Sequence, residues 1–126
     1  MDSNSPPDDL QDVLLGSFDD ITGLLAALAH PNRFKILILL SDKPLRFQTL
    51  LREMNVKKSV LANHLTHLRK KALIEKIQHG TYRITEDGKA YIQAIGLAYM
   101  ESEARKKKIK EAKQREELAR SFLERR

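Results

Sequence analysis

The stretch VKKSVLANHLTHLRKKALI, residues 56–74, combines a strong basic charge with the spacing of an amphipathic helix. Five of its residues are cations, namely Lys57, Lys58, Arg69, Lys70 and Lys71. No acidic residue occurs from position 54 to position 74. Because leucines recur inside this run at helical intervals, the sequence predicts a helix that buries one side and turns an acid-free side outward.

The predicted helix divides into two faces when each residue turns it by about 100°. One face carries the side chains for packing, namely Leu61, Leu65, Leu68 and Ala72. The other offers small or hydrogen-bonding groups beside a cation, namely Ser59, Ala62, Asn63, Thr66 and Lys70. Small residues let a helix enter the major groove, Asn and Ser can reach base edges, and cations meet phosphates. A solvated surface is the alternative, but such surfaces usually mix both signs of charge.

A shorter helix is predicted just before this one. Apolar residues recur at i, i+3, i+4 and i+7 over Phe47, Leu50, Leu51 and Met54. Asn55 follows, and Asn tolerates the left-handed conformation that ends helices. Two helices joined by such a tight turn form a helix-turn-helix unit.

Further upstream, Pro31 separates two more predicted helices, because proline ends one helix and is compatible with the first turn of another. Asp19 and Asp20 can cap the earlier helix, whose apolar stripe is Ile21, Leu24, Leu25 and Leu28. The later segment, PNRFKILILLSD at 31–42, is apolar nearly all round. We therefore predict that residues 31–42 form the central buried helix.

Two short strands are predicted downstream, from the runs LIEKIQ (73–78) and TYRIT (81–85). With His79–Gly80 as a two-residue turn, Ile77 would face Tyr82 and Lys76 would face Arg83. The outer face would then show two cations. A helix-turn-helix followed by a basic hairpin is a winged helix.

Apolar stripes also mark the predicted helices at the two ends of the domain. The first, at about residues 9–18, carries Leu10, Val13, Leu14 and Phe18. The last, which starts near position 86 with Thr85 as its N-cap, carries Ile92, Ile95 and Tyr99. We interpret both as the interface of a two-fold homodimer, which would place two recognition helices about one DNA turn (~34 Å) apart. Packing within one chain is the alternative.

Three segments follow from composition: a disordered acidic N-terminus at 1–8, the domain at 9–100, and a basic helical extension at 101–126. In the extension, four Glu-to-base pairs at i, i+4 favour a helix, each contributing about 0.2–0.5 kcal/mol. The chain has a net charge of +6, although residues 1–20 hold six Asp and no base. An acidic head on a basic body indicates a polyanionic partner.

The composition also excludes several classes of protein. The absence of cysteine excludes disulfides and thiolate metal sites. No apolar run reaches the ~18–20 residues of a membrane helix, and the acidic start lacks the cations of a secretory signal. We expect a soluble cytoplasmic protein without a membrane partner.

Three blocks, LLAALAHPNRFKILILL, VLANHLTHLRKKALIEKI and YRITEDGKAYI, resemble the ArsR- and MarR-type winged-helix transcription regulators of bacteria and archaea. The resemblance covers about residues 21–95 and implies a recognition helix within 57–72 and a wing within 74–85. The expected fold is mainly α with a small β-hairpin, a winged helix-turn-helix with N- and C-terminal dimerisation helices. The residues we expect to contact DNA are Arg46, Gln48, Lys57, Lys58, Ser59, Ala62, Asn63, Thr66, Arg69, Lys70, Lys76, His79 and Arg83.

Three positions depart from the pattern of this family. Ala62 stands where the family often has Ser, Asn63 where it has Arg, and Ala72 where it has Gly. Metal-sensing relatives carry Cys pairs in the helix corresponding to 47–54, and this chain has none. A thiol-based metal switch is therefore excluded.

The sequence thus predicts a homodimeric, sequence-specific regulator of transcription that binds double-stranded DNA. The alternatives are a sequence-tolerant architectural DNA-binding protein and a winged helix that contacts only proteins. No catalytic constellation and no phosphate-binding glycine loop is recognisable, so we expect neither enzymatic activity nor a cofactor. His64 and His67 lack a third ligand, so packed histidines are favoured over a metal site. The sequence names no target site, no effector and no direction of regulation.

Overall fold

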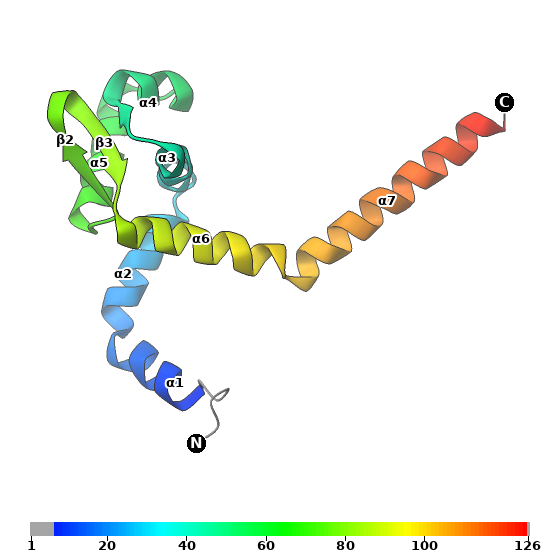
Figure 1. Ribbon diagram of the computed structural model, residues 1–126, viewed down its shortest axis with the longest axis horizontal. Helices are drawn as coiled ribbons and strands as arrows, with labels where there is room; N and C mark the ends of the chain where they lie inside the picture. The colour runs from blue at the N-terminus through cyan, green and yellow to red at the C-terminus, as the bar shows by residue number, and fades with distance from the viewer. Residues whose placement is uncertain (1–6, 126) are drawn as a thin grey trace. The chain divides into compact units, whose positions relative to one another are not determined.

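The order of helices and strands is that of a winged helix-turn-helix, as predicted (Figure 1). The computed structural model describes residues 7–125. Most of the predicted N-terminal segment 1–8 lies outside the described residues, and the first helix begins at Pro7. The chain forms two compact units, Met1–Lys89 and Ala90–Arg126.

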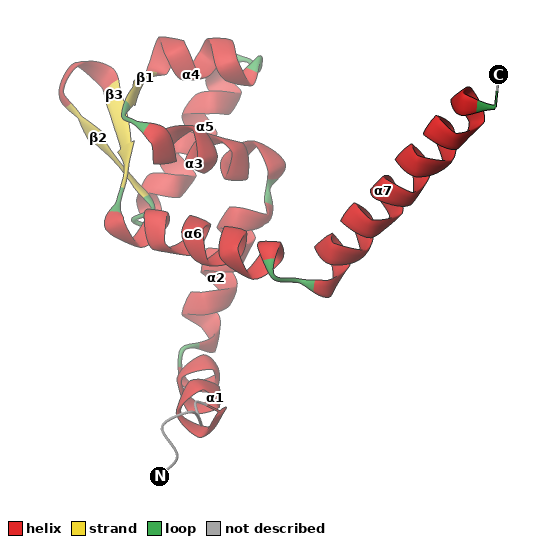
Figure 2. Ribbon diagram, turned by 45° about the vertical axis from the view of Figure 1, so that its right-hand side comes forward, coloured by secondary structure: helices red, strands yellow, loops and turns green. Residues whose placement is uncertain are grey.

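Five helices and a small sheet make up most of the first unit. The helices are α1 (Pro7–Gly16), α2 (Phe18–Ala29), α3 (Pro31–Asp42), α4 (Phe47–Met54) and α5 (Lys58–Lys70). The antiparallel sheet has the order β1-β3-β2, formed by β1 (Leu45–Arg46), β2 (Ile74–Ile77) and β3 (Thr81–Ile84) (Figure 2). The sequence predicted β2 and β3 as a hairpin, and the structure adds β1 as a third strand.

The first helix ends earlier than predicted. Helix α1 ends at Gly16 and the chain leaves the helical path at Ser17, so that Phe18 opens α2 instead of closing α1. Glycine is a poor helix former, which accounts for a break at this point. The predicted caps Asp19 and Asp20 lie in the first turn of α2, and Ser17 occupies its N-cap position.

The core lies around α3, which contributes the buried side chains of Ile36, Leu37 and Leu40. Its predicted burial is only partly correct, because Ile38 on the same helix is 47% exposed. No single helix among residues 7–125 is both long and apolar enough to cross a membrane; α2 and α3 reach that length and composition together but bend by 86° between them.

Helix α5 buries Leu61, Leu65 and Leu68 almost completely, as the sequence predicted. The helix is shorter than predicted, because Ala72 lies outside it with φ +56° and is exposed. The N–H of Leu73 donates to the carbonyl of Leu68 at 3.0 Å, and that of Ala72 donates to the carbonyl of Arg69 at 2.9 Å. These two bonds form a Schellman motif, which usually has Gly where Ala72 stands. Leu73 is thereby brought into the core, where it is fully buried.

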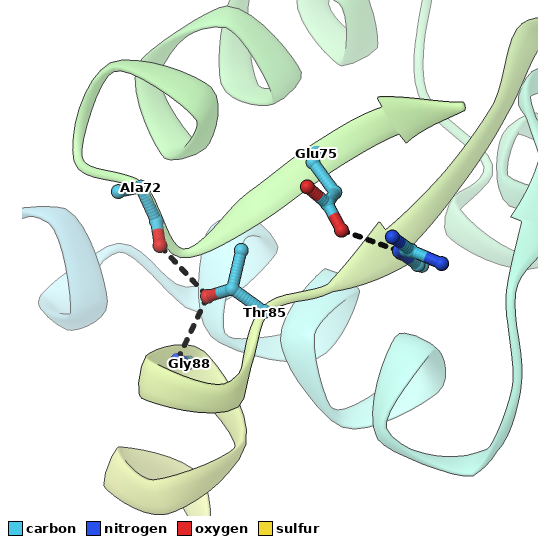
Figure 3. Close-up of polar contacts among 5 residues, drawn as sticks. Ala72, Glu75, Thr85 and Gly88 are labelled. Atoms are coloured by element: carbon cyan, nitrogen blue, oxygen red, sulfur yellow. Dashed lines mark hydrogen bonds and ion pairs between the residues drawn. The ribbon is translucent and has the colours of Figure 1, made fainter.

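Thr85 joins the end of α5 to the start of α6 (Glu86–Met100), as Figure 3 shows. Its hydroxyl donates to the carbonyl of Ala72 at 2.7 Å and accepts from the N–H of Gly88 at 3.1 Å. This confirms the predicted N-cap. A Cβ on Gly88 would lie 2.4 Å from the carbonyl oxygen of Leu73, so only glycine fits at this contact.

The register of the wing differs by one residue from the prediction. The turn has three residues, Gln78–Gly80, because His79 (φ +61°) and Gly80 (φ +65°) both adopt the left-handed conformation. Lys76 therefore lies opposite Tyr82, and Glu75 lies opposite Arg83. The prediction of an outer face with two cations was wrong, because the cation Arg83 lies opposite the acid Glu75.

His64 of α5 packs against His30, with ring centroids 4.4 Å apart. The Nδ1 of His30 accepts from the N–H of Asn32 and thereby caps α3. His64 is only 6% exposed, and its buried Nδ1 has no hydrogen-bond partner among the described residues. Burial lowers the pKa of His64, and the nearby His30, Arg33 and His67 lower it further.

The second unit contains the rest of α6 and helix α7 (Glu103–Glu124). The two helices are separated at Glu101–Ser102, where Ser102 is extended. The Ser102 hydroxyl accepts from the N–H of Arg105 at 3.2 Å and donates to the carbonyl of Tyr99 at 2.7 Å. Helix α7 thus begins afresh with its own N-cap.

The left-handed conformation of Ala72 generates a prediction about stability. Ala72→Gly should raise the free energy of unfolding by about 0.5–1 kcal/mol, because the strain of an L-residue at this φ exceeds the entropy cost of glycine. Ala62→Gly, at an exposed position inside α5, is the matched control and should lower it by about 0.5–1 kcal/mol. Urea unfolding followed by circular dichroism measures both, and a stability loss in both variants would contradict the interpretation.

The buried His64 generates a prediction about pH. Because its folded-state pKa lies below the ordinary value of 6.5, the unfolded chain binds a proton that the folded chain resists. Stability should therefore fall as the pH drops through and below about 6.5. His64→Gln should shrink the difference in unfolding free energy between pH 7.5 and pH 5.5. The control His79→Gln, at the exposed wing turn, should retain it.

Candidate nucleic-acid interface

The outward face of α5 is the centre of the candidate interface. The five residues predicted for this face, Ser59, Ala62, Asn63, Thr66 and Lys70, are all exposed, whereas the leucines of the opposite face are buried. No acid lies on this helix. The face therefore presents hydrogen-bonding groups and positive charge without a carboxylate that would repel phosphate.

Not every polar group on this face is equally available. The Thr66 hydroxyl donates to the carbonyl of Ala62 at 2.9 Å, so its proton is already used within the helix. Asn63 and Ser59 form no side-chain hydrogen bond among residues 7–125. The amide of Asn63, with both donors and an acceptor, is thus the most versatile hydrogen-bonding group of the face.

The start of α5 is open to an anion. Lys57 occupies the N-cap without a side-chain hydrogen bond to the helix, and Lys58 follows in the first turn. Both are exposed. Unpaired N–H groups and the helix dipole favour a negative group at such an end.

The turn before α5 has the conformation predicted for a helix-turn-helix. Asn55 is left-handed, with φ +54°, and its N–H donates to the carbonyl of Leu51. At the other end of α4, Arg46 and Gln48 are both exposed, as a contact with the DNA backbone would require.

An open groove of about 660 Å³ lies between the end of α3 and the start of α4. Arg46 borders it, but so do the carboxylates of Asp42 and Glu53. These acids would repel phosphate, so the groove is not part of the candidate interface.

The wing contributes less positive charge than the sequence suggested. Arg83 is exposed but forms an ion pair with Glu75, drawn in Figure 3. Lys76 is exposed, and its Nζ lies 5.9 Å from the ring centre of Tyr82. His79, exposed at the turn, completes the candidate residues of the wing. All thirteen predicted DNA contacts are therefore accessible, but Arg83 is partly neutralised.

Two residues beside the predicted face were missed by the sequence interpretation. Val60 and His67 are exposed on α5 and lie together on the helical circumference, on the side of Asn63 opposite to Ser59 and Thr66. A wider sector of the same helical projection identifies them. Lys71 lies elsewhere: a Cβ at Gly23 of α2 would be 2.9 Å from its Nζ, so its amine rests against α2.

The predicted dimerisation residues of α1 and α2 are strongly exposed, with values from 46% to 59% for Leu10, Val13, Leu14 and Phe18. In α6, Ile95 and Tyr99 are exposed and Ile92 is half-buried. No group of three His, Asp or Glu side chains suited to a metal ion occurs among the described residues.

Comparison with known proteins places these features in a family. Residues 30–76 match the family model described as the bacterial regulatory protein arsR family. This match spans α3, the helix-turn-helix and most of β2. No curated protein sequence matches the chain.

Solved structures extend the likeness beyond the matched segment. A predicted DNA-binding transcriptional regulator from E. coli is 30% identical, with a TM-score of 0.58, covering 68% of this chain and 96% of that one. Reduced HlyU from Vibrio cholerae is 26% identical, with a TM-score of 0.59, covering 70% and 97%. The transcriptional repressor BigR from Xylella fastidiosa, at 19% identity and a TM-score of 0.61, shares the fold over 74% and 98%. The chain therefore belongs to the ArsR family of bacterial regulatory proteins, which are DNA-binding winged-helix transcription regulators.

Proposed function

We propose that the protein is a homodimeric, sequence-specific regulator of transcription that inserts α5 into the major groove of DNA. The wing formed by β2 and β3 would lie on the phosphate backbone. The regulator would act in the cytoplasm, where bacterial DNA is located, and it would not be an enzyme. Insertion of α5 into the major groove and homodimerisation go beyond what membership of the family gives, and each is supported by its own observation.

The observation that carries the proposal is the division of α5 into two sides. Burial of Leu61, Leu65 and Leu68 fixes the rotation of the helix and leaves Asn63 pointing away from the core. Ser59 and Ala62 are small enough for a close approach of the helix to base edges. An Asn side chain can contact adenine through two hydrogen bonds, a contact that contributes about 1–3 kcal/mol of discrimination.

The exposed cations beside this face supply the sequence-independent part of the affinity. Lys57 and Lys58 lie at the start of α5, and Arg69 and Lys70 lie in its last turn. Phosphate contacts on both ends of a helix orient it in the groove. In the wing, Arg83 must exchange its partner Glu75 for phosphate, so it contributes less than an unpaired cation would.

Dimerisation is supported by the exposed apolar side chains of α1, including Leu10, Val13 and Leu14. Side chains of this size exposed together on one short helix favour burial against a partner. A two-fold dimer would present two copies of α5 to a site with two-fold symmetry.

Selection of bound fragments from random duplex DNA by the full chain tests the proposal. We expect an enriched, near-palindromic site that the protein prefers by about 10³-fold or more over bulk DNA. Binding without such a preference would support a sequence-tolerant architectural role instead. If no duplex is bound even at low salt, the protein does not act on DNA and the winged helix contacts only proteins.

The two kinds of contact on α5 should respond differently to mutation. Asn63→Ala should reduce the preference for the selected site, by about 1–3 kcal/mol at one base position, with little loss on unrelated DNA. Lys70→Ala should weaken all sequences alike and reduce the salt dependence by about one phosphate contact. Fluorescence anisotropy at several salt concentrations measures both quantities. Equal losses on every sequence for Asn63→Ala would remove this residue from base recognition.

The dimer should depend on the apolar side chains of α1. Leu14→Glu should shift the protein from dimer to monomer in analytical ultracentrifugation and weaken binding to the selected site by at least about tenfold, because two half-sites are no longer bound together. Ile38→Glu is the matched control, since Ile38 is exposed to nearly the same extent but lies on α3. A dimer that persists in Leu14→Glu, or that is lost equally in both variants, would place the interface elsewhere.

A further inference from the structure

Helix α7 is unusual for a helix of 22 residues, because none of its residues is buried. Most helices in proteins are stabilised by packing an apolar face, and Ile109 is the only large apolar residue in the first two thirds of this one. Its positive charge is also unevenly distributed. Residues 105–113 hold six Lys or Arg and one Glu, a net charge of +5, whereas residues 114–125 hold three Arg and three Glu, a net charge of 0.

The acids of α7 pair with few of these cations. The four i, i+4 pairs that the sequence predicted do not form among the described residues; the ion pair present on α7 joins Lys106 to Glu103 at 3.9 Å. Both side chains are more than half exposed, so this pair contributes little.

Three lysines define a stripe along the basic half. Lys106, Lys110 and Lys113 follow the spacing i, i+4, i+7 and therefore lie on one side of the helix. At a rise of about 1.5 Å per residue the stripe extends for roughly 10 Å, about three times the axial spacing of ~3.4 Å between phosphates on one DNA strand. The Ser102 cap fixes the start of the helix one turn before this stripe.

We propose that the basic half of α7, residues 105–113, is an accessory arm that binds the phosphate backbone of DNA flanking the site bound by α5. The inference rests on the proposed function, because that function brings DNA to the same chain. A membrane surface is disfavoured as the partner, since a helix that binds lipid needs a continuous apolar face opposite its cations. Such a face is missing around Ile109. The arm would add affinity and salt dependence but no sequence preference.

The test compares two full-length triple variants that lose the same charge. The stripe variant is Lys106→Gln, Lys110→Gln and Lys113→Gln. The control is Arg115→Gln, Arg120→Gln and Arg125→Gln, in the half with no net charge. Glutamine is a good helix former, and circular dichroism verifies that both variants keep their helix content. A Lys-to-Arg version of the stripe variant keeps the charge and should behave like the parent.

The measurement is the slope of log K against log salt on two duplexes holding the selected site, one of about 20 base pairs and one of about 40. On the longer duplex the magnitude of this negative slope should be smaller by about 2–3 in the stripe variant, since each lost phosphate contact removes about 0.9. The control should lower it by less than about 1. On the shorter duplex, which lacks flanking phosphates, the three proteins should differ much less. The preference for the selected site should be the same in all of them.

Three outcomes would overturn the proposal that α7 is a DNA-binding arm. An equal loss in the stripe variant and the control would show a general effect of net charge. An unchanged slope in the stripe variant would show that α7 does not contact DNA. Binding to vesicles containing phosphatidylserine that is lost in the stripe variant, with an unchanged DNA slope, would assign α7 to a membrane.

Failure of the arm and failure of the proposed function are distinguishable. If selection yields no preferred site, the proposed function fails. The arm is then tested by the salt dependence of binding to a duplex of mixed sequence of about 40 base pairs, roughly four helical turns. If a site is enriched but the slopes do not differ, only the arm fails.

Discussion

The burial of one side of α5 is the constraint on which the remaining structure depends. Leu61, Leu65 and Leu68 are each almost fully enclosed, and burial of one such side chain contributes about 1.5–3 kcal/mol. Rotating the helix by about 100°, so that Asn63 took the position of His64, would bury Asn63 and turn the three leucines outward. The position of the polar face is therefore determined by packing on the opposite side and needs no stabilising contact of its own. This leaves its hydrogen-bonding groups available to a ligand.

The junction after α5 fixes the position of the wing relative to α5. Ala72 reverses the chain in a left-handed conformation, Leu73 enters the core, and Thr85 links the two ends of the hairpin through the carbonyl of Ala72. Gly88 allows α6 to start in contact with the carbonyl of Leu73. The strands thus leave and re-enter the domain at one point, and a change at that point would alter the placement of the wing relative to α5.

Positive charge occurs in three parts of the chain: α5, the wing and α7. On α5, cations lie next to hydrogen-bonding groups, so the proposed function combines affinity and specificity on one helix. In the wing, Glu75 holds Arg83 and reduces its availability. On α7, charge occurs without base-reading groups or an apolar face, which suits a contact that contributes affinity alone. The match to the ArsR family model covers the helix-turn-helix that contains α5, whereas α7 lies outside residues 30–76.

The sequence alone determined the helix-turn-helix, the two faces of α5, the hairpin that follows it and the N-cap at Thr85, because each depends on residues only a few positions apart. Helical and strand periodicities, Pro31 and Asn55 carry this information locally. The tertiary structure decided the one-residue register of the wing, the pairing of β1 with β3, the contact of His64 with His30 and the exposure of Ile38. These features depend on residues distant in the chain, or on two successive left-handed residues at His79 and Gly80. The type and length of its turn fix the register of a hairpin, and local composition did not specify that His79 would be left-handed beside Gly80.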